Sequence, residues 1–216
     1  MGKLSLYFIR HGQTLLNADN TIIGGQSPAA ILSEKGEIEC QLLAKYLCDS
    51  GMSPDLIYSS PYVRTAKTAE KLCELLLYPV EDLFYTELIV ELSQGLWEGR
   101  VRDEVYTTQT LLEMSTQGNF FTPPGGESKM DVVMRAGQFV QKEIIKPYLE
   151  DDSDQTIIVV THGIFLKCLL YHILNFDSSF IFKTNIGNTS ITKLEYDQNG
   201  FRLCYINSSP HIILNY

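Results

Sequence analysis

The chain has 216 residues, 44% of them hydrophobic and 11% aromatic, which is enough to bury the core of one sizeable domain and argues against two large ones. With 17 basic and 26 acidic side chains the net charge is −9, so the overall field repels nucleic acid and anionic lipid. We therefore expect no nucleic-acid partner and no membrane partner. Any anionic ligand must be held by local groups.

The cysteines and the apolar runs indicate the compartment. The five cysteines are an odd number, are widely scattered and form no C-x-x-C pair, a pattern that favours neither a disulfide framework nor a zinc site. The longest purely aliphatic runs are too short to span a bilayer, and a strand-like segment that begins at Leu4 leaves no room for a signal peptide. We expect a cytoplasmic protein.

Short runs of β-branched and aromatic residues alternate with longer helical patterns, which is typical of an α/β fold with a mostly parallel sheet. Residues 4–9 form the first predicted strand. Ser33 is a suitable cap for a helix that ends near Gly51, and residues 56–59 are a second short strand. Ser60-Pro61 then places a hydroxyl cap and a proline where the next helix is predicted to begin.

The second half of the chain continues this alternation. A helix is predicted at residues 128–148, after a Gly-Gly break, and residues 156–161 are the most clearly buried strand. An apolar helix at residues 164–174 follows that strand directly. Residues 189–196 and 201–206 are predicted to form a hairpin or a pair of edge strands.

One segment, residues 93–124, fits no sheet-building pattern and is rich in Thr, Gln and aromatic residues, so we interpret it as an inserted lid. The remaining elements predict a three-layer α/β/α sandwich around a mostly parallel sheet. We therefore expect a single domain over residues 1–216, with the lid at about residues 93–124.

The first candidate site residues come directly after the first predicted strand, in the run Arg10-His11-Gly12-Gln13-Thr14, which Asn17 and Gly24-Gly25 follow. A histidine at the end of a strand, beside an arginine and before a glycine that permits a tight turn, is suited to meet a phosphoryl group. The structural alternative is a loop histidine paired with a carboxylate, and the tripeptide alone does not decide between them.

A second histidine stands in Thr161-His162-Gly163, again at a strand end and directly before a helix. Helix N-termini attract anions, so His162 can add a cationic or donor contact to a phosphate there, or it can be a structural histidine. Arg64 falls in the first turn of a helix that follows another strand. A cation there opposes the helix dipole unless an anion is bound, the alternative being a surface arginine beside a carboxylate.

Two glutamates in the segment from Glu91 to Gly99 are candidates for a general acid and base. Glu91 precedes a Gly-bounded turn that carries Trp97, and Glu98 lies beside that tryptophan. The residues alone leave the choice between the two carboxylates open.

Taken together, these blocks resemble the histidine phosphatase superfamily, in the branch that contains cofactor-dependent phosphoglycerate mutases, fructose-2,6-bisphosphatase-type phosphatases and broad-specificity small phosphatases. The Arg-His-Gly-Gln-Thr run is similar to the family's signature, residues 59–69 to its Ser-x-x-x-Arg-x-x-x-Thr-Ala helix, and residues 91–99 to its Glu-x-x-x-Gly-x-Trp-Glu-Gly loop. Residues 126–128 resemble its substrate-side turn, and residues 160–163 contain its second histidine. The resemblance covers nearly the whole chain in order and implies a phosphoglycerate mutase-like fold.

The resemblance also implies a role for each matched position. His11 would be the nucleophile that becomes phosphohistidine, and Glu91 would be the proton donor. The phosphate pocket would be formed by Arg10, Arg64 and His162. Further phosphate or substrate contacts are assigned to Gln13, Thr14, Asn17, Gly24 and Gly163. This chemistry needs no metal and no other cofactor, and the four histidines show no metal-ligand spacing.

The lid decides between hydrolysis and phosphoryl transfer within a substrate. Its only cations, Arg100 and Arg102, are outnumbered by acidic residues, whereas the related mutases have a longer and more basic lid. We therefore expect a phosphatase acting on a small phosphorylated metabolite, with a phosphoglycerate mutase as the main alternative and a phosphopeptide-binding module as a weaker one. The lid aromatics, Trp97, Tyr106, Phe120 and Phe121, fit a partly apolar wall or simple packing. The sequence does not determine the oligomeric state, and a dimer is one of the open alternatives.

Overall fold

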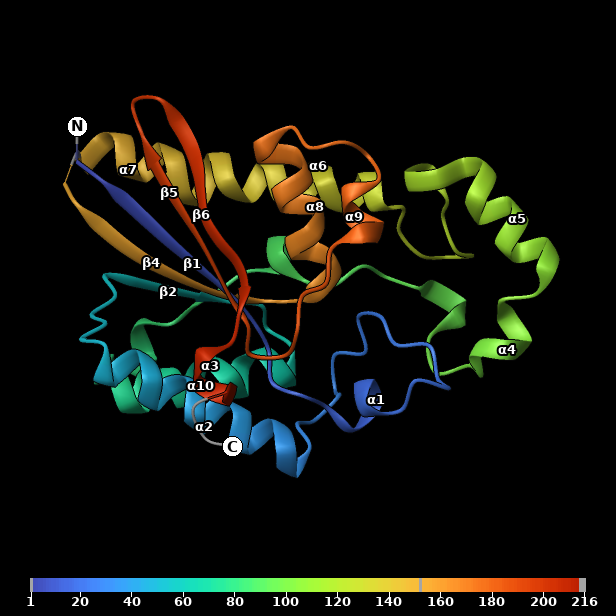
Figure 1. Cartoon of the computed structure of the whole chain (residues 1–216), viewed down its shortest axis with the longest axis horizontal. Coiled ribbons are helices and arrows are strands. Elements are labelled where there is room, and N and C mark those ends of the chain that lie inside the picture. The colour runs from blue at the N-terminus through green and yellow to red at the C-terminus, as the bar shows by residue number, and fades with distance from the viewer. Residues whose placement is uncertain (1, 152, 214–216) are drawn as a thin grey trace.

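The computed structural model describes residues 2–151 and 153–213 and contains a six-stranded sheet in the order β3-β2-β4-β1-β5-β6 (Figure 1). The strands are β1 (Leu4–Arg10), β2 (Leu56–Ser59), β3 (Phe84–Tyr85), β4 (Gln155–Thr161), β5 (Ile191–Asp197) and β6 (Gly200–Ser208). The pairs among β1 to β4 are parallel, whereas β5 runs antiparallel to β1 and β6 antiparallel to β5. The predicted α/β fold with a mostly parallel sheet is confirmed.

Helices cover both faces of this sheet. The α-helices of the described residues are α1 (Leu15–Ala18), α2 (Glu34–Asp49), α3 (Val63–Leu76), α4 (Arg102–Val105), α5 (Thr108–Gln117), α6 (Lys129–Phe139), α7 (Lys146–Asp151), α8 (Gly163–Leu174), α9 (Phe180–Lys183) and α10 (Pro210–Ile213). Ile157 and Val159 of β4 pack in one core cluster with α6, α7 and α8, whereas Ile158 and Val160 pack in the other with α2 and α3. Because side chains alternate along a strand, β4 contributes to both cores, and the result is three layers (Figure 1).

Helix α3 begins later than the sequence predicts. Tyr62 occupies its N-cap position and Val63 is its first residue, so the prediction that Ser60 caps this helix is wrong. The Ser60 N–H donates to the carbonyl of Val160 at 3.1 Å, and the Ser60 hydroxyl lies 2.9 Å from Nε2 of His162. Ser60 therefore extends the strand end and contacts the second histidine.

The helix predicted at residues 128–148 is interrupted by a π-helical segment, Val140–Ile145, between α6 and α7. Pro147 has no N–H group to donate to the carbonyl of Glu143, four residues earlier. That carbonyl accepts a hydrogen bond from the hydroxyl of Tyr58 on β2 at 3.1 Å. The proline accounts for the local change of helix type, and the sheet satisfies the carbonyl that it leaves free.

The predicted C-terminal hairpin is formed by β5 and β6. Its turn ends at Gly200, whose φ of +95° is a conformation that glycine adopts without a steric penalty. β5 starts at Ile191, two residues later than predicted, because Thr189 has a left-handed backbone with φ of +51° that does not fit a strand.

The predicted lid folds into α4, α5 and the 3₁₀ turns Gly95–Trp97 and Gly118–Phe120. In Figure 1 it lies beside the loop that follows α1 and away from the centre of the sheet. Trp97 and Val105 pack there on Ile23 in a small apolar cluster of their own. The assignment of residues 1–216 to one domain stays a prediction, and its positions 1, 152 and 214–216 lie outside the described residues.

A membrane-spanning segment would need a long apolar helix. None of the helices within residues 2–151 and 153–213 is both long and apolar enough to cross a membrane.

Candidate active site

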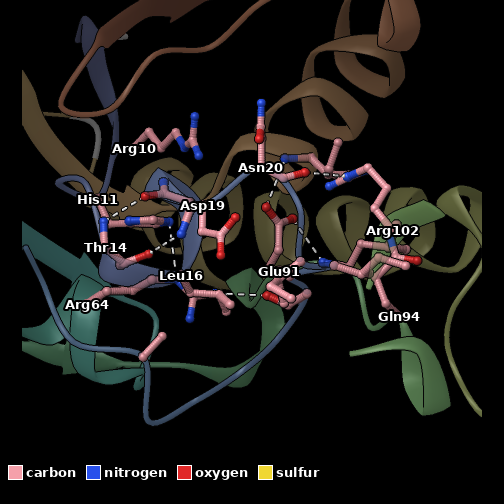
Figure 2. Close-up of a pocket in the computed structure, with 18 of the residues that line it drawn as sticks. Arg10, His11, Thr14, Leu16, Asp19, Asn20, Arg64, Glu91, Gln94 and Arg102 are labelled. Carbon is pink, nitrogen blue, oxygen red and sulfur yellow. Dashed lines mark hydrogen bonds between the residues drawn. The ribbon is translucent and has the colours of Figure 1, made fainter. Parts of the chain in front are cut away.

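A cavity of about 450 Å³ opens at the C-terminal end of β1, between the loop that follows α1 and the lid (Figure 2). Its polar and charged lining consists of Arg10, His11, Thr14, Asn17, Asp19, Asn20, Arg64, Glu91, Gln94, Arg102 and Tyr106. The ends of parallel strands are where open α/β sheets bind ligands, because the backbone and the loops leave a crevice there. Three arginines against two carboxylates make this cavity locally cationic in an acidic protein.

His11 follows the last residue of β1 and is 4% exposed. Its Nδ1 lies 2.7 Å from the carbonyl of Gly12, which can only accept, so Nδ1 carries the proton and Nε2 carries the lone pair. Burial lowers the pKa of His11 well below its ordinary value, and the charges of Arg10 and Arg64 lower it further. The imidazole is therefore neutral at pH 7.

Gly12 permits the close packing behind this histidine. A Cβ at this position would lie 2.6 Å from Sγ of Cys40 and 2.8 Å from the carbonyl oxygen of Gly36. Its N–H donates to Thr68 on α3 at 3.1 Å. Any larger residue would push the His11 loop off α2 and α3.

Arg64, in the first turn of α3, links the two predicted histidines. Each of its five N–H groups has an acceptor within 3.2 Å: Nε2 of His11, Nδ1 of His162 and the carbonyl oxygens of Gly25, Gln26 and Ser27. The predicted conflict between a cation and the helix N-terminus is thus balanced by backbone oxygens and imidazole lone pairs.

His162, the N-cap of α8, is fully buried and does not line the cavity among the residues described. Since a guanidinium can only donate, Nδ1 of His162 accepts from Arg64. Nε2 of His162 then carries the proton and donates to the Ser60 hydroxyl at 2.9 Å. Burial and the nearby Arg64 lower its pKa well below the ordinary value. In this state His162 is a neutral partner of Arg64, which fits the structural alternative for this residue better than a cationic contact.

Arg10 is held from the side opposite Arg64. Its Nη1 donates to the carbonyl of Ile186 at 2.7 Å, while its buried Nε has no hydrogen-bond partner within residues 2–151 and 153–213. A buried donor at the cavity wall without an acceptor is costly, and an anion in the cavity would satisfy it. A Cβ on Gly163 would lie 3.4 Å from this Nε, which is an ordinary van der Waals contact, so Gly163 lies directly beside the Arg10 guanidinium.

Glu91 binds the N-terminus of α8. Its two carboxylate oxygens accept from the N–H groups of Ile164 and Phe165, each at 3.1 Å, and one also accepts from Leu92 at 2.9 Å. The free helix N–H groups that the sequence analysis assigns to a phosphate are thus occupied by this carboxylate. Glu91 lines the cavity across from His11 (Figure 2).

Arg135 on α6 holds the backbone around Glu91. It donates to the carbonyls of Leu88, Val90 and Glu91 at 2.8 to 3.4 Å and forms an ion pair with Glu127 at 3.2 Å. Glu127 in turn accepts from the N–H of Ser93 at 2.9 Å. Glu127, in the predicted substrate-side turn, therefore supports the Glu91 segment.

Glu98 has a different environment from Glu91. Its two oxygens accept four hydrogen bonds, from the N–H groups of Gln26, Ser27 and Gln94 and from the Ser27 hydroxyl, at 2.9 to 3.1 Å. It ties the lid to the loop whose carbonyls hold Arg64. It does not line the cavity.

The other predicted contact residues separate into two groups. Thr14, Asn17 and Gly24 line the cavity, whereas Gln13 and Gly163 do not. The Gln13 side chain faces α2, because its Oε1 accepts from the Ser33 hydroxyl at 3.0 Å. Gln13 is therefore a structural residue of the loop in this state.

Four polar residues around the cavity were not among the candidates from the sequence: Asp19, Asn20, Gln94 and Asn188. Asp19 and Asn20 line the cavity beyond Asn17 and had no motif signal. Asn188, in the loop before β5, donates from Nδ2 to the carbonyl of His11 at 2.9 Å. Its only signal is a place in a short loop between α9 and β5.

The lid contributes less to the cavity than its aromatic content predicts. Tyr106 lines the cavity, Trp97 and Phe121 pack in the apolar cluster with Ile23, and Phe120 is 71% exposed. Arg102 is the lid cation that lines the cavity, with its guanidinium 5.2 Å from the Tyr106 ring centre. In the part of the chain that the structure describes, no three His, Cys, Asp or Glu side chains form a group that could hold a metal ion.

Comparisons with known proteins agree with this geometry. The family model of the histidine phosphatase superfamily (branch 1) matches residues 6–209. The chain is 28% identical to a 2,3-bisphosphoglycerate-dependent phosphoglycerate mutase from Bartonella henselae, over 85% of this chain and 87% of the relative. It is 26% identical to phosphoserine phosphatase 1 from Hydrogenobacter thermophilus, over 97% of this chain and 94% of the relative. The solved structure of a mycobacterial glucosyl-3-phosphoglycerate phosphatase superposes with a TM-score of 0.80 at 25% identity, covering 96% of this chain and all of that one.

Proposed function

We propose that this chain, which belongs to branch 1 of the histidine phosphatase superfamily, is a phosphatase that hydrolyses small phosphate monoesters through a phosphohistidine on His11. The observation that carries the proposal is the contact of Arg64 with both His11 and His162 at 3.1 Å, beside the unsatisfied Nε of Arg10. Phosphoryl transfer needs positioning and charge neutralisation above all, and two guanidinium groups at one neutral imidazole supply both.

In the first step the lone pair on His11 Nε2 forms a bond to phosphorus while the ester P–O bond breaks. The incoming phosphoryl oxygens take over N–H groups that Arg64 donates in the free protein, which releases Nε2 for in-line attack. Nδ1–H remains bound to the Gly12 carbonyl at 2.7 Å and so stabilises the positive charge that the ring acquires. Protonated Glu91 gives its proton to the leaving alkoxide.

In the second step the Glu91 carboxylate takes a proton from water, and the water oxygen bonds to phosphorus as the N–P bond breaks. Inorganic phosphate leaves, His11 is neutral again and Glu91 is again protonated. Support for Glu91 over Glu98 in this role comes from its position in the cavity, since the oxygens of Glu98 hold the loop of residues 26 and 27.

The lid favours hydrolysis over mutase activity. A mutase must grip a second anionic group firmly while the phosphoryl group moves between two hydroxyls, and Arg102 is the lid cation at this cavity. The similarity to a phosphoglycerate mutase from Bartonella henselae keeps the mutase as the second candidate. A module that only binds a phosphopeptide, without hydrolysing it, would not need the positioned carboxylate of Glu91, so Glu91 favours an enzyme over such a module.

The test is to incubate the purified protein with 3-phosphoglycerate, with and without 2,3-bisphosphoglycerate, and to separate inorganic phosphate from the 2-isomer. Release of inorganic phosphate as the main product, with no dependence on the bisphosphate, is the expected result. Dominant isomerisation that requires the bisphosphate would reverse the assignment.

A further inference from the structure

The loop between α9 and β5 contacts both residues at the end of β1. The Ile186 carbonyl accepts from Nη1 of Arg10 at 2.7 Å, and the N–H of Thr189 donates to the Arg10 carbonyl at 3.0 Å. Asn188 lies between them and donates from Nδ2 to the carbonyl of His11 at 2.9 Å. This loop therefore holds the backbone of the nucleophile.

Asn188 also contacts Asn17, which lines the cavity. Its Oδ1 accepts from Nδ2 of Asn17 at 3.2 Å, and Oδ1 of Asn17 accepts from the N–H of Thr14 at 2.7 Å. Four groups thus form one directed chain, which runs from the Thr14 N–H through two amides to the His11 carbonyl.

The two ends of this chain fix the orientation of both amides. A backbone N–H can only donate and a backbone carbonyl can only accept, so Asn17 must turn its oxygen to Thr14, and Asn188 must turn its nitrogen to His11. The nitrogen of Asn17 donates to Asn188, and Asn17 lines the cavity. One of its two N–H groups is bound to Asn188, and the second remains for a ligand.

The backbone beside Asn188 is held in a conformation that a β-branched residue rarely adopts. Thr189 has φ of +51°, and its hydroxyl donates to the Asn188 carbonyl at 2.8 Å. That hydroxyl has only one proton, so it accepts from Nε2 of His211, 3.0 Å away on α10. Local strain of this kind persists where the surroundings enforce it, and here they hold Asn188 against Asn17 and His11.

We propose that Asn188 is a positioning residue that turns an N–H group of Asn17 toward the phosphoryl oxygens, so that Asn17 acts as a fixed donor in the phosphate pocket. The proposal rests on the proposed function for the identity of the anion. Without Asn188, the amide of Asn17 keeps its bond to Thr14 but loses the partner that fixes its nitrogen. Preorganised donors bind an anion more tightly than donors that must first be ordered.

The experiment measures inorganic phosphate binding by titration calorimetry, which does not need turnover and so separates this proposal from a failure of the proposed hydrolysis. Asn188→Leu removes both amide bonds without adding charge and should weaken phosphate binding roughly 10-fold. Asn207→Asp is the control, on strand β6, where the Asn207 side chain contacts the same loop. Asn207 uses its oxygen to accept from the N–H of Gly187, a bond that aspartate retains, so phosphate binding should change by less than about 3-fold.

A double-mutant cycle with Asn17→Ala then identifies the route of the effect. If Asn188 acts through Asn17, Asn188→Leu should weaken phosphate binding by less than about 3-fold when Asn17 is already alanine. Thermal unfolding of each variant checks that the fold is kept, and Asn188→Ser replaces Asn188→Leu if the latter does not fold. A full 10-fold loss in both backgrounds, a loss of the same size in Asn207→Asp, or no phosphate binding by the parent protein would overturn the proposal.

Discussion

The Nε–H group of Arg64 donates to Nε2 of His11 across 3.1 Å, so the cation that would bind the substrate also holds the nucleophile. All five N–H groups of Arg64 are occupied in the free protein. A phosphoryl group must therefore exchange with these acceptors when it binds. Arginine suits this exchange because its planar fork presents several donors at fixed angles.

Arg64→Lys tests this dual role. Lysine keeps the charge but cannot reach His11, His162 and a phosphoryl oxygen at once, so we expect kcat/KM to fall by about 10²-fold or more with p-nitrophenyl phosphate. Vanadate, an analogue of the trigonal-bipyramidal transition state, should inhibit the variant far more weakly than the parent protein. A variant with the parent's kcat/KM and vanadate inhibition would show that charge alone suffices.

The roles of Glu91 and Glu98 are separated by the leaving group. Nitrophenolate leaves without a proton, so Glu91→Gln should cost the first transfer step little with p-nitrophenyl phosphate but roughly 10²-fold or more with an alkyl phosphate. Burst or single-turnover kinetics are needed, because Glu91 also activates water in the second step. Glu98→Gln is the matched control and should show no dependence on the leaving group. Equal first-step losses for both esters in Glu91→Gln would exclude it as the general acid.

Arg102 should matter for substrates that carry a second anionic group. Its guanidinium lines the cavity and its Nε donates to the carbonyl of Asn20 at 2.9 Å. We expect Arg102→Gln to raise KM about 10-fold for 3-phosphoglycerate, which has a carboxylate, and to leave KM for p-nitrophenyl phosphate nearly unchanged. Arg100→Gln, at a lid position that does not line the cavity, is the control. Similar KM changes for both substrates in Arg102→Gln would contradict this assignment.

Stability should fall as the pH drops below about 6.5, the usual pKa of histidine. Burial lowers the pKa of His11 and His162 well below that value and that of His211 to about 4. The unfolded chain thus binds protons that the native chain does not. Between its unfolded-state pKa and its lower folded-state pKa, each such histidine reduces the free energy of unfolding by about 1.4 kcal/mol for every unit that the pH falls. Urea unfolding at pH 7.5, 6.5 and 5.5 measures the slope.

His211→Gln removes one of these three groups and keeps an N–H donor for Thr189. Its free energy of unfolding should therefore depend less steeply on pH between about 6.5 and 4 than that of the parent protein. An unchanged slope would mean that His211 does not titrate differently in the folded and unfolded chains.

Patterns within the chain predicted β1, β2, β4, β5 and β6, because hydrophobic alternation and strand-end motifs are local signals, but they did not predict the two-residue strand β3. Arg10 and His11 were found in this way, Glu91 was one of two candidate carboxylates, and the structure brings these three to one cavity. Local signals do not predict a residue's hydrogen-bond partner when that partner lies far away in the sequence. The Ser60 hydroxyl is bound by His162 instead of capping α3, and the carbonyl of Glu143 finds Tyr58 across the sheet.

The same limit applies to the site. Whether a carboxylate faces the cavity or ties two loops together depends on contacts far along the chain, so residue patterns alone did not separate Glu91 from Glu98, and only the family resemblance assigned the proton donor to Glu91. Glu91 binds α8 about 73 residues away, and Glu98 binds the loop of residues 26 and 27. Asn188 lies 177 residues from His11 in sequence, and no motif connects the two.

In the proposed reaction, His11 Nε2 becomes phosphorylated during hydrolysis. The direct measurement is rapid mixing of the parent protein with a phosphate monoester, a quench that avoids acid, and mass spectrometry of the peptide that contains His11. We expect transient phosphate on His11 during turnover, with no phosphorylated peptide and no turnover in His11→Ala. A His11→Ala protein that still hydrolyses the ester, or phosphate trapped on another residue, would contradict it.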